Sequence, residues 1–172
     1  DVQLIHSPHV AEKVPVGTLY GIGLNYSAHI EEMKSQRATE PVVFIKPATA
    51  LVSGQRALDY PDALSQCVHH EVELVLLLGH DLWQANAQQA QQAILGVGVG
   101  LDLTLRDRQQ AAKAAGRPWA VAKGFKGSAP VSPFVLTPPP DTLNNLSLTL
   151  EINQELRQQG NTRQMLFSCV EI

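Results

Sequence analysis

The sequence contains few cysteines, few charges and no long apolar run. Its two cysteines, Cys67 and Cys169, form neither a CxxC pair nor a disulfide framework, which favours a reduced, cytoplasmic protein. No apolar segment approaches the roughly 18 residues of a membrane-spanning helix, so we expect no membrane partner. The net charge of −3 gives none of the basic surface typical of nucleic-acid binding, so we expect no nucleic-acid partner.

The remaining composition is that of a folded globular protein. Hydrophobic residues make up 44% of the 172 residues and charged residues 17%, which is far from the composition of disordered chains. This length suits one domain with a sizeable core, and we predict a single domain over residues 1–172. The chain begins at Asp1 rather than Met, and Ile172 lies inside an apolar stretch. We therefore expect that a C-terminal segment is missing.

Strand signals outnumber helix signals along the chain. Strands are predicted over residues 14–23, 41–47, 71–79, 96–103, 146–152 and 155–162, the last two as a hairpin. Helices are predicted over residues 28–36, 87–95 and 104–116, with Ser27, Asn86 and Thr104 as caps. Short strands and turns are expected over residues 119–135. The mixture predicts a β-rich α+β fold.

Two glutamates one residue apart, Glu71 and Glu73, stand at the start of an apolar run that ends at Gly79. Alternate residues of a strand face the same side, so both carboxylates are expected to point together into an apolar interior. Two buried carboxylates do not both stay ionised without a compensating positive charge, and a divalent cation is the simplest compensation. The alternative is an exposed edge strand with solvated acids.

Asp102 adds a third carboxylate in a second apolar strand, although it could instead only cap the following helix. Three oxygen ligands suit Mg²⁺, Mn²⁺ or Ca²⁺ better than Zn²⁺. His69 and His70 are expected to support the ligands rather than bind the metal, because at most one of them shares the glutamate face. The glycines of Gly96-x-Gly-x-Gly100 lead into a strand-like segment rather than a helix, which argues against a phosphate-binding loop.

Several further polar residues are candidates for chemistry. His29 and Glu32 are spaced i, i+3 on a predicted helix and can form an acid–base pair, or a surface contact without function. Arg106, Gln109 and Lys113 share one helix face, which could anchor a substrate carboxylate or face solvent. Lys123 is flanked by apolar residues, so it should be paired or catalytic, and Lys46 is a weaker case of the same kind.

Six segments in order resemble the fumarylacetoacetate hydrolase family, in particular its small acylpyruvate hydrolase and oxaloacetate-handling members. These segments are residues 23–29, 40–47, 69–74, 101–107, 118–123 and 156–160. The resemblance implies a compact β-roll of mixed sheets with a few short helices, commonly paired as a homodimer. The sequence departs from the family pattern in lacking the later segment with a Thr-Gly-Thr-Pro loop.

The resemblance also implies roles for the candidate residues. Glu71, Glu73 and Asp102 would bind Mg²⁺ or Mn²⁺, with Ca²⁺ as a substitute, while Arg106 and Lys46 would bind an α-keto acid substrate. Lys123 and Gln109 would lie near the reacting group, and the His29–Glu32 dyad would act from a lid. The expected reaction is metal-dependent hydrolysis of a C–C bond in an acylpyruvate through an enolate.

Two alternatives stay open at this point. The first is an isomerase or decarboxylase of the same family, acting on 2-hydroxyhepta-2,4-diene-1,7-dioate or oxaloacetate, with keto–enol tautomerisation included. The second is a non-catalytic protein that binds keto acids and holds a structural metal.

Overall fold

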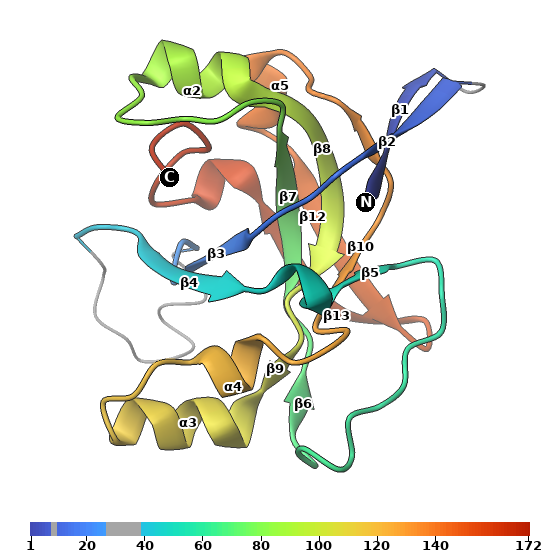
Figure 1. The fold of residues 1–172 in the computed structure, drawn as a ribbon, viewed down its shortest axis with the longest axis vertical. Coiled ribbons are helices and arrows are strands. Elements are labelled where there is room, and N and C mark those ends of the chain that lie inside the picture. The colour runs from blue at the N-terminus through green and yellow to red at the C-terminus, as the bar shows by residue number, and fades with distance from the viewer. Residues whose placement is uncertain (8–9, 27–38) are drawn as a thin grey trace.

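Strands dominate the structure, a computed structural model that describes residues 1–7, 10–26 and 39–172. Figure 1 shows strands β7 (Val72–Leu78) and β8 (Ile94–Leu101) in the middle of the molecule. Helices α2 (Ala87–Ala93) and α5 (Pro140–Leu143) lie near one end of this pair, whereas α3 (Arg106–Ala114) and α4 (Ala120–Lys123) lie beyond the other. The predicted β-rich α+β class is confirmed. Across the described ranges, no helix is long and apolar enough to cross a membrane.

A mixed sheet of seven strands forms the centre of the described fold. Its order is β2-β1-β11-β8-β10-β5, and β7 pairs with β8 outside this path. The bounds of the other strands are Val2–Ser7 (β1), Val10–Val14 (β2), Leu51–Ser53 (β5), Ala129–Val131 (β10) and Phe134–Leu136 (β11). The β1–β11 and β5–β10 pairs are parallel and the others antiparallel, so the sheet is mixed, as the β-roll expectation requires.

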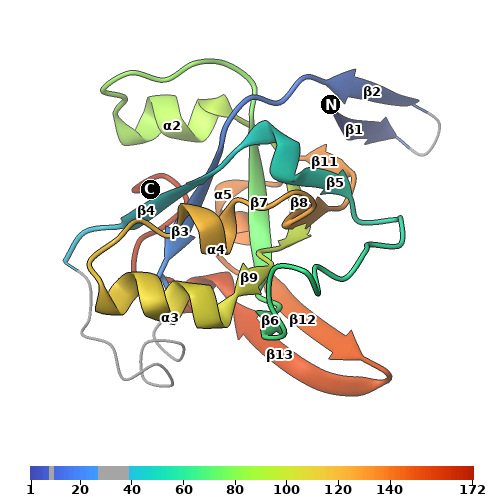
Figure 2. The same cartoon turned by 60° about the horizontal axis from the view of Figure 1, so that its bottom comes forward.

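Three two-stranded sheets surround this centre. They are formed by β3 (Leu19–Gly23) with β4 (Val42–Lys46), β6 (Val68–His69) with β9 (Thr104–Leu105), and β12 (Ser147–Ile152) with β13 (Glu155–Asn161). Two 3-10 turns, η1 (Ala48–Ala50) and η2 (Thr162–Gln164), complete the described elements. The β12–β13 hairpin confirms the prediction for this segment, and Figure 2 shows it extending away from the main sheet. Its two turn residues, Asn153 and Gln154, both have positive φ, as a tight hairpin turn demands.

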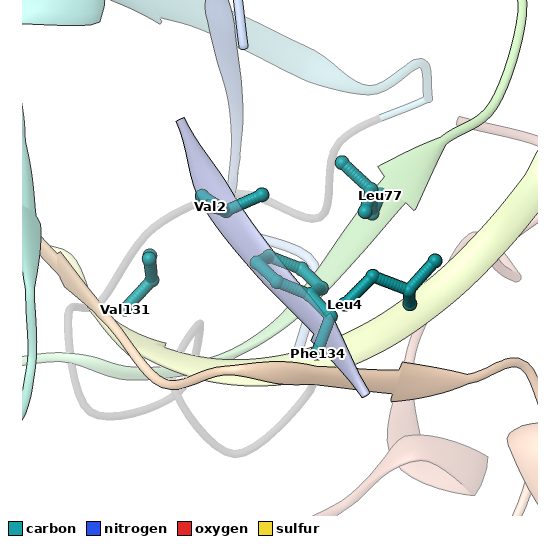
Figure 3. Packing of buried hydrophobic residues seen from close by; sticks show 5 residues of the cluster. All are labelled: Val2, Leu4, Leu77, Val131 and Phe134. Atoms are coloured by element: carbon teal, nitrogen blue, oxygen red, sulfur yellow. The ribbon is translucent and has the colours of Figure 1, made fainter. Parts of the chain in front are cut away.

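The apolar run of β7 is explained by two cores, one on each face of the strand. Figure 3 shows the first, in which the Phe134 ring lies among Val2, Leu4, Leu77 and Val131. The second core contains Ile94, Val97, Leu143 and Cys169, with Leu74 and Leu76 of β7 packed against it. A strand covered on both faces carries apolar residues without alternation.

The glycines of β8 serve packing. A Cβ on Gly96 would lie 2.9 Å from Leu4 Cδ1, and a Cβ on Gly100 would lie 2.8 Å from Val75 Cγ2. A Cβ on Gly96 would also lie 2.9 Å from the Val135 carbonyl oxygen, which is backbone, whereas a Cβ on Gly100 would require the Val75 side chain to shift. The glycine spacing thus reflects close strand contacts, in agreement with the argument against a phosphate loop.

Several local predictions were wrong, among them the single strand over residues 14–23, because β2 ends at Val14 and β3 begins at Leu19. The capping box of Asn86 with Gln89 is present, but α2 ends at Ala93 because Ile94 already pairs as the first residue of β8. Thr104 pairs in β9 instead of capping α3, which begins at Arg106 without a side-chain cap. The stretch expected to hold only strands and turns also contains the helix α4.

Candidate functional site

The three predicted metal ligands meet where the β7–β8 ladder ends. Glu73 faces Gly100 in the antiparallel register, and Val72 faces Leu101. The pairing continues one step beyond the strands, because the Asp102 amide donates to the Glu71 carbonyl at 2.8 Å. Glu71 therefore precedes β7 rather than lying within it, which corrects the prediction that its strand begins at residue 71. Strand pairing nevertheless brings together acids that are about thirty residues apart in sequence.

These acids line a cavity of about 290 Å³. Its walls come from β3, β4, α3, α4 and the β12–β13 hairpin, together with the segment around Glu71. The candidate residues that line it are Glu71, Glu73, Asp102, Arg106, Gln109, Lys113 and Lys123. Lys46 is absent from the lining. The structure thus brings together the described candidates except Lys46, His69 and His70, which do not line the cavity.

Lys123 lies between two of the carboxylates. Its ammonium is 2.9 Å from Glu71 Oε2 and 2.5 Å from Asp102 Oδ2, and it donates to Thr104 Oγ1 at 2.7 Å. The side chain is only 2% exposed, and its Nζ lies 4.9 Å from the centre of the Phe44 ring. A lysine ammonium has three N–H donors, so these three oxygens occupy all of them. Lys123 was predicted to be paired or catalytic, and the structure shows the pairing.

Arg106 completes the cationic side of the cavity. One terminal nitrogen donates to Glu71 Oε1 at 2.6 Å and the other to Gln109 Oε1 at 2.6 Å. The first turn of α3 makes the second contact possible, because residues three apart on a helix are neighbours. The guanidinium has five N–H donors, so three remain for a ligand.

The electrostatic surroundings shift the pKa values of Glu71 and Glu73 in opposite directions. Burial would raise the pKa of Glu71, but the Lys123 ammonium and the Arg106 guanidinium outweigh it and lower this pKa to about 2. Burial raises the pKa of Glu73 to about 8, and the negative charges of Asp102 and Glu71 add to the effect. Among the described residues, no Lys, Arg or His forms an ion pair with Glu73. Glu73 is therefore the carboxylate in need of a cation.

The donor set fits a hard divalent cation, although the side chains are not arranged around one. Within the described ranges, no three His, Cys, Asp or Glu groups form a cluster ready to hold a metal, and the Lys123 ammonium lies between Glu71 and Asp102. Asp102 Oδ1 is buried and lies 2.8 Å from Lys46 Nζ, so this lysine supplies its counter-charge. The carboxylate oxygens of Glu71, Asp102 and Glu73, the last without an ion pair among the described residues, are the hard ligands that Mg²⁺ and Mn²⁺ prefer.

Lys46 lies behind the site rather than in it. It is 4% exposed, and its ammonium faces protein oxygens, including Asp102 Oδ1 and the carbonyl and hydroxyl of Ser128. Burial lowers the pKa of Lys46, and the Asp102 carboxylate opposes this shift. The expectation that Lys46 binds substrate directly has no support in this placement.

Two aromatic residues that line the site were not predicted as site residues from the sequence. Phe44 and Trp119 line the cavity with ring centres 6.0 Å apart, and the Lys113 ammonium lies 5.0 Å from the centre of the Trp119 ring. Phe44 can lie there because its partner across the β3–β4 pair is Gly21. A Cβ on Gly21 would come within 2.2 Å of that ring. The glycine opposite an aromatic residue was the available signal, but only the strand register reveals it.

Gln158 was also missed as an individual residue, although its segment contributed to the resemblance. Its side-chain oxygen accepts from the Val72 amide at 2.8 Å, and its nitrogen donates to the His70 carbonyl at 3.0 Å. The side chain from β13 thus holds the backbone on both sides of Glu71. His29 and Glu32, the predicted acid–base dyad, lie outside the described residues.

The chain matches a known protein family and is similar to named proteins. Residues 18–172 match the family described as Fumarylacetoacetate (FAA) hydrolase C-terminal. The chain is 45% identical over 162 residues to oxaloacetate tautomerase YcgM of Escherichia coli (strain K12), covering 92% of this chain and 72% of that protein. It is 39% identical over 147 residues to the mitochondrial oxaloacetate tautomerase FAHD1 of Homo sapiens, covering 86% and 66%.

Solved structures share the fold over nearly the whole chain. A putative fumarylacetoacetate hydrolase family protein from Yersinia pestis CO92 has a TM-score of 0.91 at 42% identity, covering 98% of this chain and 77% of that one. Fumarylpyruvate hydrolase from Pseudomonas aeruginosa, solved with Mn²⁺ and pyruvate, has a TM-score of 0.87 at 34% identity, covering 99% and 74%. The mixed, curled sheet with few helices is therefore the fold of these proteins.

Proposed function

Because the chain belongs to the fumarylacetoacetate hydrolase family, we propose that it is a divalent-metal-dependent enzyme acting on a short α-keto diacid. We further propose that its main reaction is the keto–enol interconversion of oxaloacetate. Similarity to oxaloacetate tautomerases, including YcgM and human FAHD1, supports the choice of reaction. The charges of the cavity support the choice of a diacid.

The charge inventory of the cavity carries this proposal. Glu71, Glu73 and Asp102 share the cavity with the cationic side chains of Arg106, Lys113 and Lys123, whereas Arg157 of the same lining is paired with Glu155. A divalent cation added to this set leaves a clear excess of positive charge around a cavity of about 290 Å³. A small substrate with two carboxylates would complement that charge better than one with a single carboxylate.

Glu71, Glu73 and Asp102 would hold Mg²⁺ or Mn²⁺, which when bound would polarise the substrate's keto group as a Lewis acid. Arg106 has the free N–H donors to bind the carboxylate beside that keto group. Lys113, over Trp119, is placed to attract the second carboxylate. Lys123 can donate to a substrate oxygen only when one of its three present contacts opens. Enolisation moves a proton from the carbon next to the keto group, and the His29–Glu32 pair is our candidate for that transfer.

Hydrolysis of a C–C bond in an acylpyruvate is the second candidate. The resemblance to fumarylpyruvate hydrolase favours it. Hydrolysis requires a base that activates water against the distal carbonyl, which is the role expected for His29 held by Glu32. Binding of the keto-acid end would be the same in both reactions, so the two candidates differ in the fate of the remainder of the substrate.

Turnover of matched substrates distinguishes these reactions. The purified protein is incubated with Mg²⁺, with Mn²⁺ or with a chelator, and supplied with oxaloacetate or acetylpyruvate. Metal-dependent loss of enol absorbance from oxaloacetate without pyruvate formation supports tautomerisation, whereas pyruvate from oxaloacetate indicates decarboxylation. Pyruvate from acetylpyruvate indicates hydrolysis. Binding of oxalate at the metal with no turnover of either keto acid would refute the enzymatic proposal and leave a binding protein.

A further inference from the structure

We propose that Lys46 is a positioning residue that holds Asp102 and the backbone of Lys123 from behind the cavity without contacting substrate. The inference rests on the proposed metal-dependent function, because Asp102 and Lys123 matter through that chemistry. Lys46 is the last residue of β4 and is not among the residues that line the cavity, whereas Phe44 of the same strand is. Phe44 and Lys46 are two residues apart and so start from the same face of β4, but the Lys46 ammonium ends among protein oxygens that include Asp102 Oδ1 and the Ser128 carbonyl.

Oxygens from three separate segments surround the Lys46 ammonium. Asp102 Oδ1 lies at 2.8 Å and the Leu103 carbonyl at 3.2 Å. The carbonyl and hydroxyl of Ser128 lie at 2.9 and 3.0 Å, and the Lys123 carbonyl is a further acceptor. One side chain therefore joins the segment after β8, the end of α4 and the start of β10.

The contact with the Lys123 carbonyl holds the backbone from which the Lys123 side chain extends into the site. This carbonyl lies at the end of α4, where helices leave carbonyl groups without intrahelical partners. It accepts from Lys46 Nζ and, at 2.7 Å, from Ser128 Oγ. With the peptide held in this way, the Lys123 side chain leaves the helix in one direction, toward Glu71 and Asp102.

The contact with Asp102 gives Lys46 an electrostatic reason to be a lysine. A buried ammonium is strongly destabilising unless it is paired, and the Asp102 carboxylate supplies the pairing charge. In return, Asp102 has Lys46 at Oδ1 and Lys123 at Oδ2, so its carboxylate plane is fixed from both sides. A neutral residue at position 46 would leave one side open.

Mn²⁺ affinity separates a positioning role from the loss of a charge. Removing a positive charge close to the carboxylates would by itself tighten Mn²⁺ binding. Loss of the Asp102 geometry would weaken it, and removal of residues that support metal ligands commonly costs about 10- to 100-fold. We therefore expect Lys46→Met to raise the Kd for Mn²⁺ about tenfold or more, measured by titration calorimetry. Unchanged or tighter binding would overturn the inference.

Steady-state kinetics separate positioning from substrate contact. Lys46→Met should lower kcat for oxaloacetate about 10- to 100-fold with KM changed much less, whereas a raised KM at unchanged kcat would identify a substrate contact. Lys126→Met is the matched control, because Lys126 is exposed, and it should leave both Mn²⁺ affinity and kinetics unchanged. If wild type turns over no keto acid, the proposed function fails but the Mn²⁺ titration still decides this inference.

A second variant tests the proposal in case Lys46→Met does not fold. Ser128→Ala removes one hydroxyl that bonds both Lys46 and the Lys123 carbonyl, and it leaves the charges in place. We expect a folded protein with weaker Mn²⁺ binding and a lower kcat than wild type at similar KM. If Lys46→Met does not fold and Ser128→Ala matches wild type in both measurements, Lys46 stabilises the fold only and the positioning role is refuted.

Discussion

Replacing Glu73 with Gln removes the charge of this carboxylate and keeps its size. In the metal-free protein the pKa of Glu73 is raised from 4.5 to about 8, by burial first and by Asp102 and Glu71 next. At 1.4 kcal/mol per pH unit, this shift corresponds to at most about 5 kcal/mol against ionising Glu73 in the folded state. Partial access to solvent reduces the effect, so we expect about 2–4 kcal/mol.

The sign of the stability effect follows from proton binding. Between pH 4.5 and about 8 the folded protein retains the Glu73 proton, whereas the unfolded chain releases it. The contribution of Glu73 is therefore fully present below pH 4.5 and is lost as the pH rises through 8. In urea unfolding with a chelator present, metal-free wild type should lose stability over this range relative to Glu73→Gln. Equal pH profiles for the two proteins would refute the reasoning.

Metal binding should reverse this cost by displacing the proton. A site that requires ionised Glu73 releases about 0.9 proton per Mn²⁺ at pH 7 and about 0.1 at pH 9. Calorimetry in buffers of different ionisation enthalpy measures this number directly. Glu73→Gln should release almost no proton and bind Mn²⁺ weakly. Wild-type binding at pH 7 without proton release, or tight binding by the variant, would remove Glu73 from the ligand set.

Three further changes test other parts of the site. His29→Ala should lower turnover by roughly two to four powers of ten while Mn²⁺ binding survives, and unchanged turnover would exclude the dyad from the mechanism. Lys113→Met should raise KM for oxaloacetate about tenfold but leave inhibition by pyruvate, which lacks a second carboxylate, unchanged; a parallel loss of both would argue against a diacid site. Gly21→Ala should cost about 1–3 kcal/mol of unfolding free energy, because the new Cβ meets the Phe44 ring. Gly17→Ala, where a Cβ meets nothing within 4 Å, is its control, and equal losses would contradict the packing argument.

The acidic half of the site was predictable because it depends on local pattern. The apolar run after Glu71 indicated a buried strand, and β7 is covered on both faces. A buried strand with acids at its start leaves few explanations other than a cation site. The exact strand limit was not predictable, because Glu71 is held by the pairing of its carbonyl with Asp102, a contact distant in sequence.

The sequence predicted which cationic residues belong to the site, but not how their side chains are arranged in it. Lysines flanked by apolar residues must find partners, so Lys46 and Lys123 were both recognised. Which oxygens they face depends on how α4 packs against β4 and β9, and these segments are far apart in the chain. Sequence reasoning therefore placed both lysines toward the substrate, whereas the fold turns Lys46 toward Asp102 and Ser128.

The balance of these charges couples the binding of the metal to the binding of the substrate. In the structure the Lys123 and Arg106 cations pair with Glu71, and Lys46 and Lys123 pair with Asp102, so three cations surround these two carboxylates and more than offset their charge. Adding a divalent cation alone increases this excess of positive charge, and adding a dianion alone displaces cations from their carboxylates. Binding of the cation therefore lowers the free energy needed to bind the dianion, and binding of the dianion does the same for the cation. Because such coupling is reciprocal, the metal should tighten substrate binding by the same factor as the substrate tightens binding of the metal.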